Sequence, residues 1–300
     1  MSSETSDKSS KEHLDGPATM SPEGTLGGKK LSLEPYKGTR DFYPQDQFVQ
    51  NYIFGVWKKV VESYGYLEYN ASILEETELY RAKSGEEIVG EQTYSFKDRG
   101  DREVTIRPEM TPTVARMVAQ KRRELTFPLR WYSIPNLFRY ERPQRGRLRE
   151  HWQLNVDMFG VDSVEADVEI ISLAYDIMMS FGAKPEQFII RLNNRRALSK
   201  MLEKMGLNEE KQRAFRTLLD KKNKIKDFDE QAIALLGKPF NISAMQDEEI
   251  GNLINLLAKR GITNAQYDPY LVRGFDYYTG TVFELYDTNP ENPRALFGGG

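Results

Sequence analysis

The sequence predicts an α+β fold in which β-strands are flanked by helices and interrupted by a helical insertion. Apolar residues recur at helical spacing over residues 44–64 and 162–181, and residues 195–260 are strongly helical in pattern. Shorter segments rich in β-branched and aromatic residues separate these helices and predict strands, at residues 67–74, 138–160, 188–192 and 281–285.

The two clearest helices have identifiable ends. Between Pro44 and Tyr64 the apolar side chains recur every three or four residues, at Phe48, Tyr52, Val56, Val60 and Val61. Gly65 follows where a helix C-terminal glycine belongs, and Gly182 takes the same place after residues 162–181. Both segments therefore predict amphipathic helices that each end at a glycine.

The composition excludes several kinds of chemistry. The chain has 300 residues, a net charge of −3 and 39% hydrophobic residues, which suffice for a sizeable core. It contains no cysteine, which excludes disulfides and thiolate catalysis, and it has only two histidines, His13 and His151, which leaves almost no residues for a histidine-based triad. Catalysis must therefore depend on electrostatics, and we expect no protein-bound metal site.

The N-terminal residues predict a disordered tail. Residues 1–30 are rich in serine, glycine, threonine and charge and have no apolar stretch, so they do not form a signal peptide. A mitochondrial transit peptide is not expected either, because the first arginine is Arg40 and the tail carries several acidic residues. No apolar run reaches the length of a membrane span. We therefore expect a soluble, cytoplasmic protein with no membrane partner.

Residues 271–285, LVRGFDYYTGTVFEL, predict a binding site. They place Arg273 and the adjacent Tyr277 and Tyr278 in a short turn bounded by Gly274 and Gly280. A strand-like run then follows. From spacing alone, a hairpin with surface aromatics explains this segment equally well.

A charged turn between two strand-like runs at residues 138–160 predicts a second binding surface. Five arginines fall between positions 139 and 149, a pattern that by itself is typical of a solvated face. Polar residues then alternate with apolar ones over residues 153–158, and Arg139 and Glu141 share a face of the first run. Two neighbouring strands would form a floor with cations at one end and hydrogen-bonding groups at the other. Such a floor suits a ligand with phosphates and a polar side chain.

Four segments, in order, resemble histidyl-tRNA synthetases, which are class II aminoacyl-tRNA synthetases. They are KGTRD at 37–41, RPEMT at 107–111, FRYERPQRGRLREHWQ at 138–153, which is similar to motif 2, and LVRGFDYYTG at 271–280. The resemblance implies an antiparallel class II sheet flanked by helices. It also implies ATP-dependent activation of L-histidine to histidyl-adenylate and transfer to tRNA(His), with ATP as substrate and Mg²⁺.

The resemblance also implies roles for individual residues. Arg139 and Arg273 would be catalytic, on opposite sides of the α-phosphate, and arginine suits this task because its planar guanidinium stays charged and binds oxygens bidentately. The ATP-binding residues would be Arg139, Glu141, Arg147 and His151. The histidine-binding residues would be Glu109, Thr111, Gln153, Asp157, Tyr277 and Tyr278. Many members have glutamate where this chain has Asp157, and phenylalanine where it has His151.

We expect a catalytic core over residues 31–192, a helical insertion over 193–262 and a return to the core over 263–300. Motif 1, at residues 44–74, implies a homodimer, although Ser72 stands where the motif usually has proline. The lysine-rich insertion would contact tRNA or form a solvated face. The sequence ends where the family continues into motif 3 and an anticodon-binding domain. The resemblance therefore implies that this chain is a C-terminally incomplete synthetase. Residues 1–300 alone are expected to be inactive.

Two other classes compete with this interpretation. The regulatory subunit of ATP phosphoribosyltransferase is a non-catalytic, histidine-sensing paralogue whose catalytic arginines are typically lost, whereas Arg139 and Arg273 are present here. A plain RNA-binding protein would not need Glu109, Gln153 and Asp157 on a shared polar floor, and no RNA-binding motif appears. Both comparisons favour the synthetase.

Overall fold

The computed structural model describes residues 32–82, 92–143, 146–220, 225–239, 246–272 and 277–300, with Lys222 and Ile242. It also describes the backbone of two short strands, β1 (Thr25–Leu26) and β2 (Lys29–Lys30), which pair with each other. Most of the tail predicted over residues 1–30 therefore lies outside the described residues. The fold is α+β, as the sequence predicts.

A three-stranded sheet occupies the first half of the chain. Its strands are β3 (Leu67–Glu68), β7 (Leu129–Ser133) and β10 (Asn155–Phe159), in the order β10-β7-β3. Strand β10 runs antiparallel to β7 and β3 runs parallel to it. Helix α4 (Thr111–Lys121) covers one face through Val114 and Val118. Helices α1 (Pro44–Ser63) and α5 (Val164–Ser180) cover the other face.

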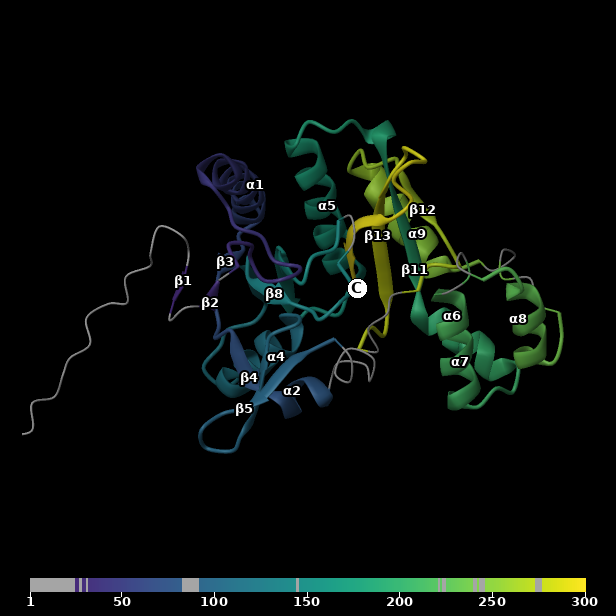
Figure 1. The fold of residues 1–300 in the computed structure, drawn as a ribbon. Helices are drawn as coiled ribbons and strands as arrows, with labels where there is room; N and C mark the ends of the chain where they lie inside the picture. The colour runs from purple at the N-terminus through teal and green to yellow at the C-terminus, as the bar shows by residue number, and fades with distance from the viewer. Residues whose placement is uncertain are drawn as a thin grey trace, which may run out of the picture.

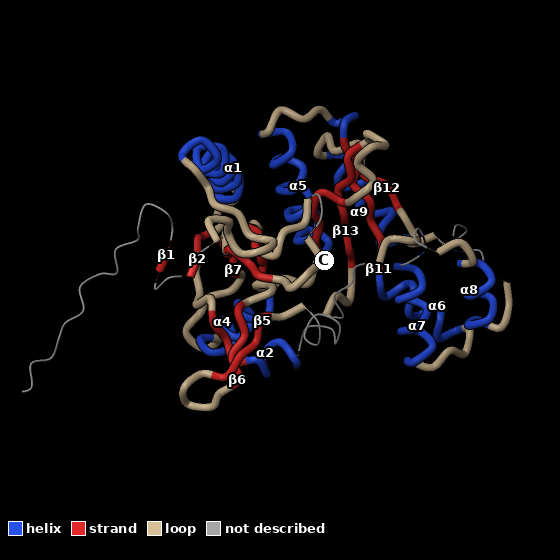
Figure 2. Tube along the Cα trace, in the orientation of Figure 1, coloured by secondary structure: helices blue, strands red, loops and turns tan. Residues whose placement is uncertain are grey.

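Two smaller groups of strands complete this half. Strands β4 (Leu74–Glu76), β6 (Glu103–Ile106) and β5 (Tyr94–Lys97) form an antiparallel sheet beside helix α2 (Thr77–Arg81). Strands β8 (Asn136–Phe138) and β9 (Glu150–Trp152) form a hairpin. Figure 1 shows β4 and β5 close to α2 and α4, and Figure 2 shows β6 in the same group.

A four-stranded sheet occupies the second half, in the order β12-β11-β13-β14. Its strands are β11 (Phe188–Asn194), β12 (Ala265–Tyr267), β13 (Thr281–Asp287) and β14 (Ala295–Gly299), and a short 3₁₀ turn (Pro185–Gln187) precedes β11. Helices α5 and α9 (Glu248–Lys259) bury one face of this sheet. Helix α5 thus packs on both large sheets, since Ile171 belongs to this core and Ile177 to the core under α1.

Three further helices, α6 (Arg195–Lys204), α7 (Glu209–Asp220) and α8 (Phe228–Leu236), gather around a core of their own. Figure 1 shows them as a group at the end of the sheet that carries β11. Helix α9 follows them in sequence but packs on the sheet. The division of the chain at residues 193 and 262 remains a prediction.

The predicted helices at 44–64 and 162–181 are confirmed, and Gly65 and Gly182 have positive φ angles of 81° and 86° directly after them. The prediction of one strand over residues 67–74 is wrong. Strand β3 ends at Glu68 and β4 begins at Leu74, because the first pairs with β7 and the second with β6.

The predicted pairing around the charged turn is also wrong. Strand β8 ends at Phe138, so Arg139 and Glu141 follow the strand, and β8 pairs with β9, whereas β10 pairs with β7. Pro135 interrupts the ladder between β7 and β8 because it has no N–H to donate. Beyond β8, the backbone N–H of Tyr140 donates to Gln92, so the chain changes partner at this point. No helix among the described residues is long and apolar enough to cross a membrane.

Candidate functional site

Arg139 joins the β8–β9 hairpin to the loop that precedes α4. Its Nε donates to the carbonyl oxygen of Pro108 at 2.9 Å, and its backbone N–H donates to Arg149 across the hairpin at 2.8 Å. Arg147 forms an ion pair with Glu141, with Nη1 and Oε2 separated by 3.0 Å. The hairpin therefore presents a cation directly beside the segment that carries Glu109.

Arg149 anchors the same hairpin to the N-terminal KGTRD segment. Its guanidinium lies 3.9 Å from the ring centroid of Tyr140, and its Nη1 donates to the Tyr36 hydroxyl at 3.1 Å. Its backbone N–H donates to the carbonyl oxygen of Gly38 at 2.6 Å, and its Nε donates to the carbonyl oxygen of Glu141 at 3.2 Å. Tyr36 and Gly38 thus hold the hairpin in place through Arg149.

His151 lies on β9, opposite Leu137 of β8. Its pKa is lowered to about 4, chiefly by burial and also by the charge of Arg139, while Glu141 acts in the opposite direction. The imidazole is therefore neutral at pH 7 and presents a flat aromatic ring without charge beside Arg139 and Glu141.

Glu109 is a buried carboxylate in the loop before α4, with only 3% of its surface exposed. The hydroxyl of Tyr277 donates to its Oε2 at 2.8 Å. Burial raises the pKa of Tyr277 above its ordinary value, and the Glu109 charge adds to this effect, while a hydrogen bond with Thr111 opposes it. The structure therefore brings together three of the predicted histidine-binding residues from segments far apart in the sequence.

Arg107 fixes the loop that carries these groups. The residue is 5% exposed, and its guanidinium donates to the carbonyl oxygens of Ala71 and Asn136 and to the side chain of Asn136 at 2.9–3.1 Å. Burial lowers the pKa of Arg107. The loop is thus attached both to the β8–β9 hairpin and to the segment that follows β3.

Asp157 lies on β10, opposite Trp131 of β7. Burial raises the pKa of its carboxyl to about 7, and a hydrogen-bonding interaction with Tyr69 acts in the opposite direction. Gln153 lies between β9 and β10, and its side-chain amide donates to Asn155 at 2.7 Å. Gln153 therefore lies beside β10, the strand to which Asn155 and Asp157 belong.

Tyr278 packs edge-on against Tyr277, with ring centroids 4.9 Å apart. A Cβ atom on Gly300 would lie 2.7 Å from the Tyr278 ring, and one on Gly299 would lie 2.8 Å from Phe283. Only glycine therefore fits beside β13 here. Arg273 and Gly274, which the sequence singled out, lie outside the described residues.

The sequence alone did not identify Tyr36, Tyr140 or Arg149 as parts of the site, because no local spacing connects residues a hundred positions apart. The glycine run at the end of β14 was the one available signal for close packing beside Tyr278. Among the described residues, no group of three or more histidine, aspartate or glutamate side chains is arranged to hold a metal ion.

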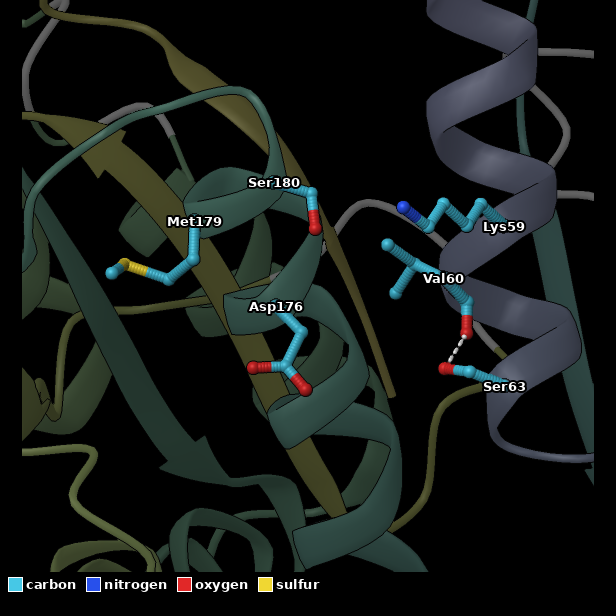
Figure 3. A pocket seen from close by; sticks show the side chains of 6 residues that line it. All are labelled: Lys59, Val60, Ser63, Asp176, Met179 and Ser180. Carbon is cyan, nitrogen blue, oxygen red and sulfur yellow. Dashed lines mark hydrogen bonds between the residues drawn. The ribbon is translucent and has the colours of Figure 1, made fainter.

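A separate pocket of about 340 Å³ lies between α1 and α5, away from these residues. It is lined by Lys59, Val60, Ser63, Asp176, Met179 and Ser180. Figure 3 shows the first three on α1 and the other three on α5, with the hydroxyl of Ser63 donating to the carbonyl oxygen of Val60. None of the predicted site residues lines this pocket.

The α+β fold and the arginine hairpin facing a buried glutamate define a class II aminoacyl-tRNA ligase, and comparisons with known proteins agree. A model of histidyl-tRNA synthetase matches residues 38–231. The histidine–tRNA ligase of Leptospira biflexa is 50% identical over 297 residues, which cover 91% of this chain and 68% of the relative. That of Thermoplasma volcanium is 38% identical and covers 90% of this chain and 68% of the relative. The chain belongs to the histidyl-tRNA synthetase family.

Solved structures share the fold. Apo histidyl-tRNA synthetase of S. aureus has a TM-score of 0.64 at 27% identity and covers 90% of this chain and 66% of that chain. A protein from Bacillus halodurans described as an ATP phosphoribosyltransferase regulatory subunit/histidyl-tRNA synthetase has a TM-score of 0.75 at 23% identity, covering 91% of this chain and 76% of that chain. At that identity, the second likeness shows the fold alone.

Proposed function

We propose that this chain carries the site at which L-histidine and ATP form histidyl-adenylate, from which histidine passes to tRNA(His). One observation carries the proposal, namely the 2.9 Å contact between Arg139 and the carbonyl oxygen of Pro108. This contact holds a guanidinium next to the loop of Glu109. An amino acid whose ammonium group binds Glu109 would thus have its carboxylate near the cation that also binds the α-phosphate.

The proposed reaction brings two anions together. An oxygen of the histidine carboxylate attacks the α-phosphorus of ATP, the bond to the β-phosphate breaks, and pyrophosphate leaves. A fixed cation stabilises the charge that develops in such a transition state and reduces the repulsion between the reactants. We assign this task to Arg139 and, by resemblance, to Arg273 on the opposite side. Arg147 would contact the terminal phosphates, and Glu141 the adenine amino group.

For the amino acid, we assign Glu109, Thr111 and Gln153 to the ammonium group, and Asp157 and Tyr278 to the imidazole. The burial of Glu109 supports its role, because a buried carboxylate requires a positive or hydrogen-bonding partner. A ligand ammonium group would add a positive partner to the hydroxyl of Tyr277, which donates to Glu109 Oε2. His151 would stack on adenine as a neutral ring.

Magnesium would enter this site with the nucleotide. Mg²⁺ is usually held by substrate phosphates and one or two carboxylates, and it keeps several waters. In that position the ion would neutralise phosphate charge, while the arginines orient the α-phosphate.

Helix α1 supports the proposal of a homodimer. Its outer face exposes Phe48, Val49 and Tyr52, with 75%, 54% and 57% of their surfaces accessible. Adjacent exposed apolar residues of this kind mark protein interfaces. We propose that a second copy of the chain covers them. Contact of the helices α6–α8 with tRNA and a cytoplasmic location also remain predictions.

Pyrophosphate exchange tests the proposed chemistry. We would measure it for residues 1–300 and for a chimaera in which the part of the Leptospira biflexa relative that follows its match to Gly300 is added. We expect the chimaera to exchange pyrophosphate in the presence of histidine, ATP and Mg²⁺. Replacing Glu109 with Gln should remove the exchange, and glutamine or asparagine as substrates should not support it.

The outcomes separate the candidate functions. Exchange driven equally by another amino acid would contradict the histidine assignment. Histidine binding in calorimetry without exchange by the chimaera would favour the non-catalytic histidine-sensing alternative. No binding of histidine to either protein would contradict both.

A further inference from the structure

Asn193 is a buried polar residue near the end of β11, and only 2% of its surface is exposed. Ile190 and Leu192 on the same strand belong to the core under α5 and α9. Successive side chains of a strand point to opposite faces, so Asn193 points away from that core. There it meets the part of the chain that leads from β12 toward β13.

The side-chain amide of Asn193 holds this part of the chain at two points. Its Nδ2 donates to the carbonyl oxygen of Leu271 at 2.8 Å and to that of Pro269 at 3.2 Å. Its Oδ1 accepts from the backbone N–H of Asn194 at 2.8 Å. Both N–H groups and the oxygen of the amide are therefore used. Because hydrogen bonds are directional, two of them from one rigid amide fix the position of the bound chain and its direction.

Asp268 attaches the same turn to β11 through its own groups. Its backbone N–H donates to the carbonyl oxygen of Leu192 at 2.8 Å, and its carboxylate accepts from the backbone N–H of Tyr270 at 2.9 Å. The carboxylate also forms an ion pair with Arg191, with Oδ2 and Nη1 separated by 3.4 Å. Three consecutive residues of β11, 191–193, thus hold the turn.

The far end of this segment returns to the same place. The backbone N–H of Arg195, the first residue of α6, donates to the carbonyl oxygen of Gly280 at 3.0 Å, and β13 begins at the next residue. Both described ends of the segment 268–280 are therefore attached to residues 191–195. One end depends on the Asn193 side chain and the other on a main-chain group.

Apolar packing does not replace the amide of Asn193. Tyr270 and Val272 pack against the core of α6–α8, and Leu271 is buried. Such contacts hold the segment against the helices but are not directional, so they leave its exact position open. Without the amide, the buried carbonyl oxygen of Leu271 would also lose its donor, and the segment would have to move to find another.

The segment carries two groups of the proposed active site. Arg273 follows Leu271 by two positions, and the hydroxyl of Tyr277 donates to Glu109 at 2.8 Å. A misplacement of about 1 Å at a reacting group can slow a reaction about 10²-fold. We propose that Asn193 is a positioning residue, whose amide fixes the start of the segment and thereby the place of Arg273 during adenylation. This inference rests on the proposed function and extends it to a residue assigned to neither substrate.

Asn193→Asp and Asn193→Leu test the inference, because both keep the approximate size of the side chain and remove its two N–H donors. The same two substitutions at Asn264 are matched controls. The Nδ2 of Asn264 also donates to two main-chain carbonyl oxygens, those of Pro185 and Phe188 at 3.0 and 2.8 Å, but at the opposite end of β11.

We would measure pyrophosphate exchange by the chimaera at pH 8 with varied histidine. In both Asn193 variants kcat should fall about 10- to 100-fold, as for a displaced catalytic group. KM for histidine should change less than about threefold, because the end of the segment next to Tyr277 and Tyr278 stays attached through the main chain of Arg195. The Asn264 variants should keep kcat within about twofold.

Hydrogen exchange on residues 1–300 follows the segment itself. The amides of residues 270–272 should exchange about tenfold faster in the Asn193 variants and at the wild-type rate in the Asn264 variants. Faster exchange throughout the chain, without a specific effect at residues 270–272, would show a general structural role and contradict the inference.

Three kinetic outcomes would also overturn it. They are an unchanged kcat in the Asn193 variants, an equal fall of kcat in the Asn264 variants, and a rise of KM for histidine as large as the fall of kcat. If the wild-type chimaera does not exchange pyrophosphate, the proposed function fails and this inference fails with it.

Discussion

Replacing Gly38 with alanine should lower the stability of the fold and disturb the β8–β9 hairpin, which we assign to ATP binding. Gly38 has a φ angle of 88°, where a residue with a Cβ atom costs about 1–2 kcal/mol. An added Cβ would also lie 2.7 Å from Cγ and 3.1 Å from Cβ of Arg149. These atoms are at the base of the side chain, so a rotation of its flexible end does not relieve the contact.

The backbone cannot easily relieve it either, because the carbonyl oxygen of Gly38 accepts a hydrogen bond from Arg149 at 2.6 Å. Overpacking of this kind typically costs a further 1–3 kcal/mol, approximately. We therefore expect Gly38→Ala to lower the free energy of unfolding by about 2–5 kcal/mol, the sum of the two costs.

Gly65→Ala is a matched control. Gly65 has nearly the same φ angle, 81°, but nothing lies within 4 Å of an added Cβ. It should cost only the backbone term of about 1–2 kcal/mol. Equilibrium urea unfolding of both variants measures the difference, and calorimetry with ATP measures whether the shift of Arg149 disturbs the hairpin. Equal destabilisation by the two variants, or unchanged ATP affinity in Gly38→Ala, would refute the reasoning.

Three other changes test separate parts of the structure. Arg139→Lys keeps the charge but loses the Nε–H contact with Pro108, so single-turnover adenylation by the chimaera should fall about 10²-fold, and an unchanged rate would remove Arg139 from the mechanism. Asp157→Asn should become increasingly stabilising relative to the wild type as the pH rises from about 4 to about 7. Burial raises the pKa of Asp157 to about 7, and the stability contributed by such a carboxyl is lost as the pH rises through that value. Urea unfolding at several pH values checks this, and parallel pH profiles of the two proteins would contradict it. Phe48→Glu should convert a dimer into a monomer in sedimentation analysis without lowering the melting temperature, since Phe48 is 75% exposed in the single chain; a wild-type monomer would argue against the α1 interface.

Local patterns predicted the helices well because the relevant information is local. Apolar spacing and a following glycine were enough for α1 and α5. The strands were harder, since a strand is defined by its partner. Nothing within residues 67–74 indicates that Leu67 pairs with Trp131 and Leu74 with Ile106. A prediction of one continuous strand was therefore natural and wrong.

The candidate site depended even more on distant contacts. Glu109 and Tyr277 meet across 168 positions, and only the resemblance to a known family suggested that both serve one ligand. Asp157 and Ser133 are more than twenty positions apart in the sequence. Only the register of β7 and β10 shows that they share one face of the sheet.

Helix α5 acts as a spacer between the two groups that would hold the substrate. Leu173 and Ile177 pack toward the sheet of Asp157, whereas Ile171 and Ala174 pack toward the sheet that leads from Tyr278 into β13. Asp167 on this helix accepts a hydrogen bond from Thr281 at the start of β13. In the proposed histidine site, the separation of Asp157 from Tyr278 would therefore depend on side-chain volume in α5. A cavity or an excess methyl group in α5 should alter substrate affinity without any contact with the substrate.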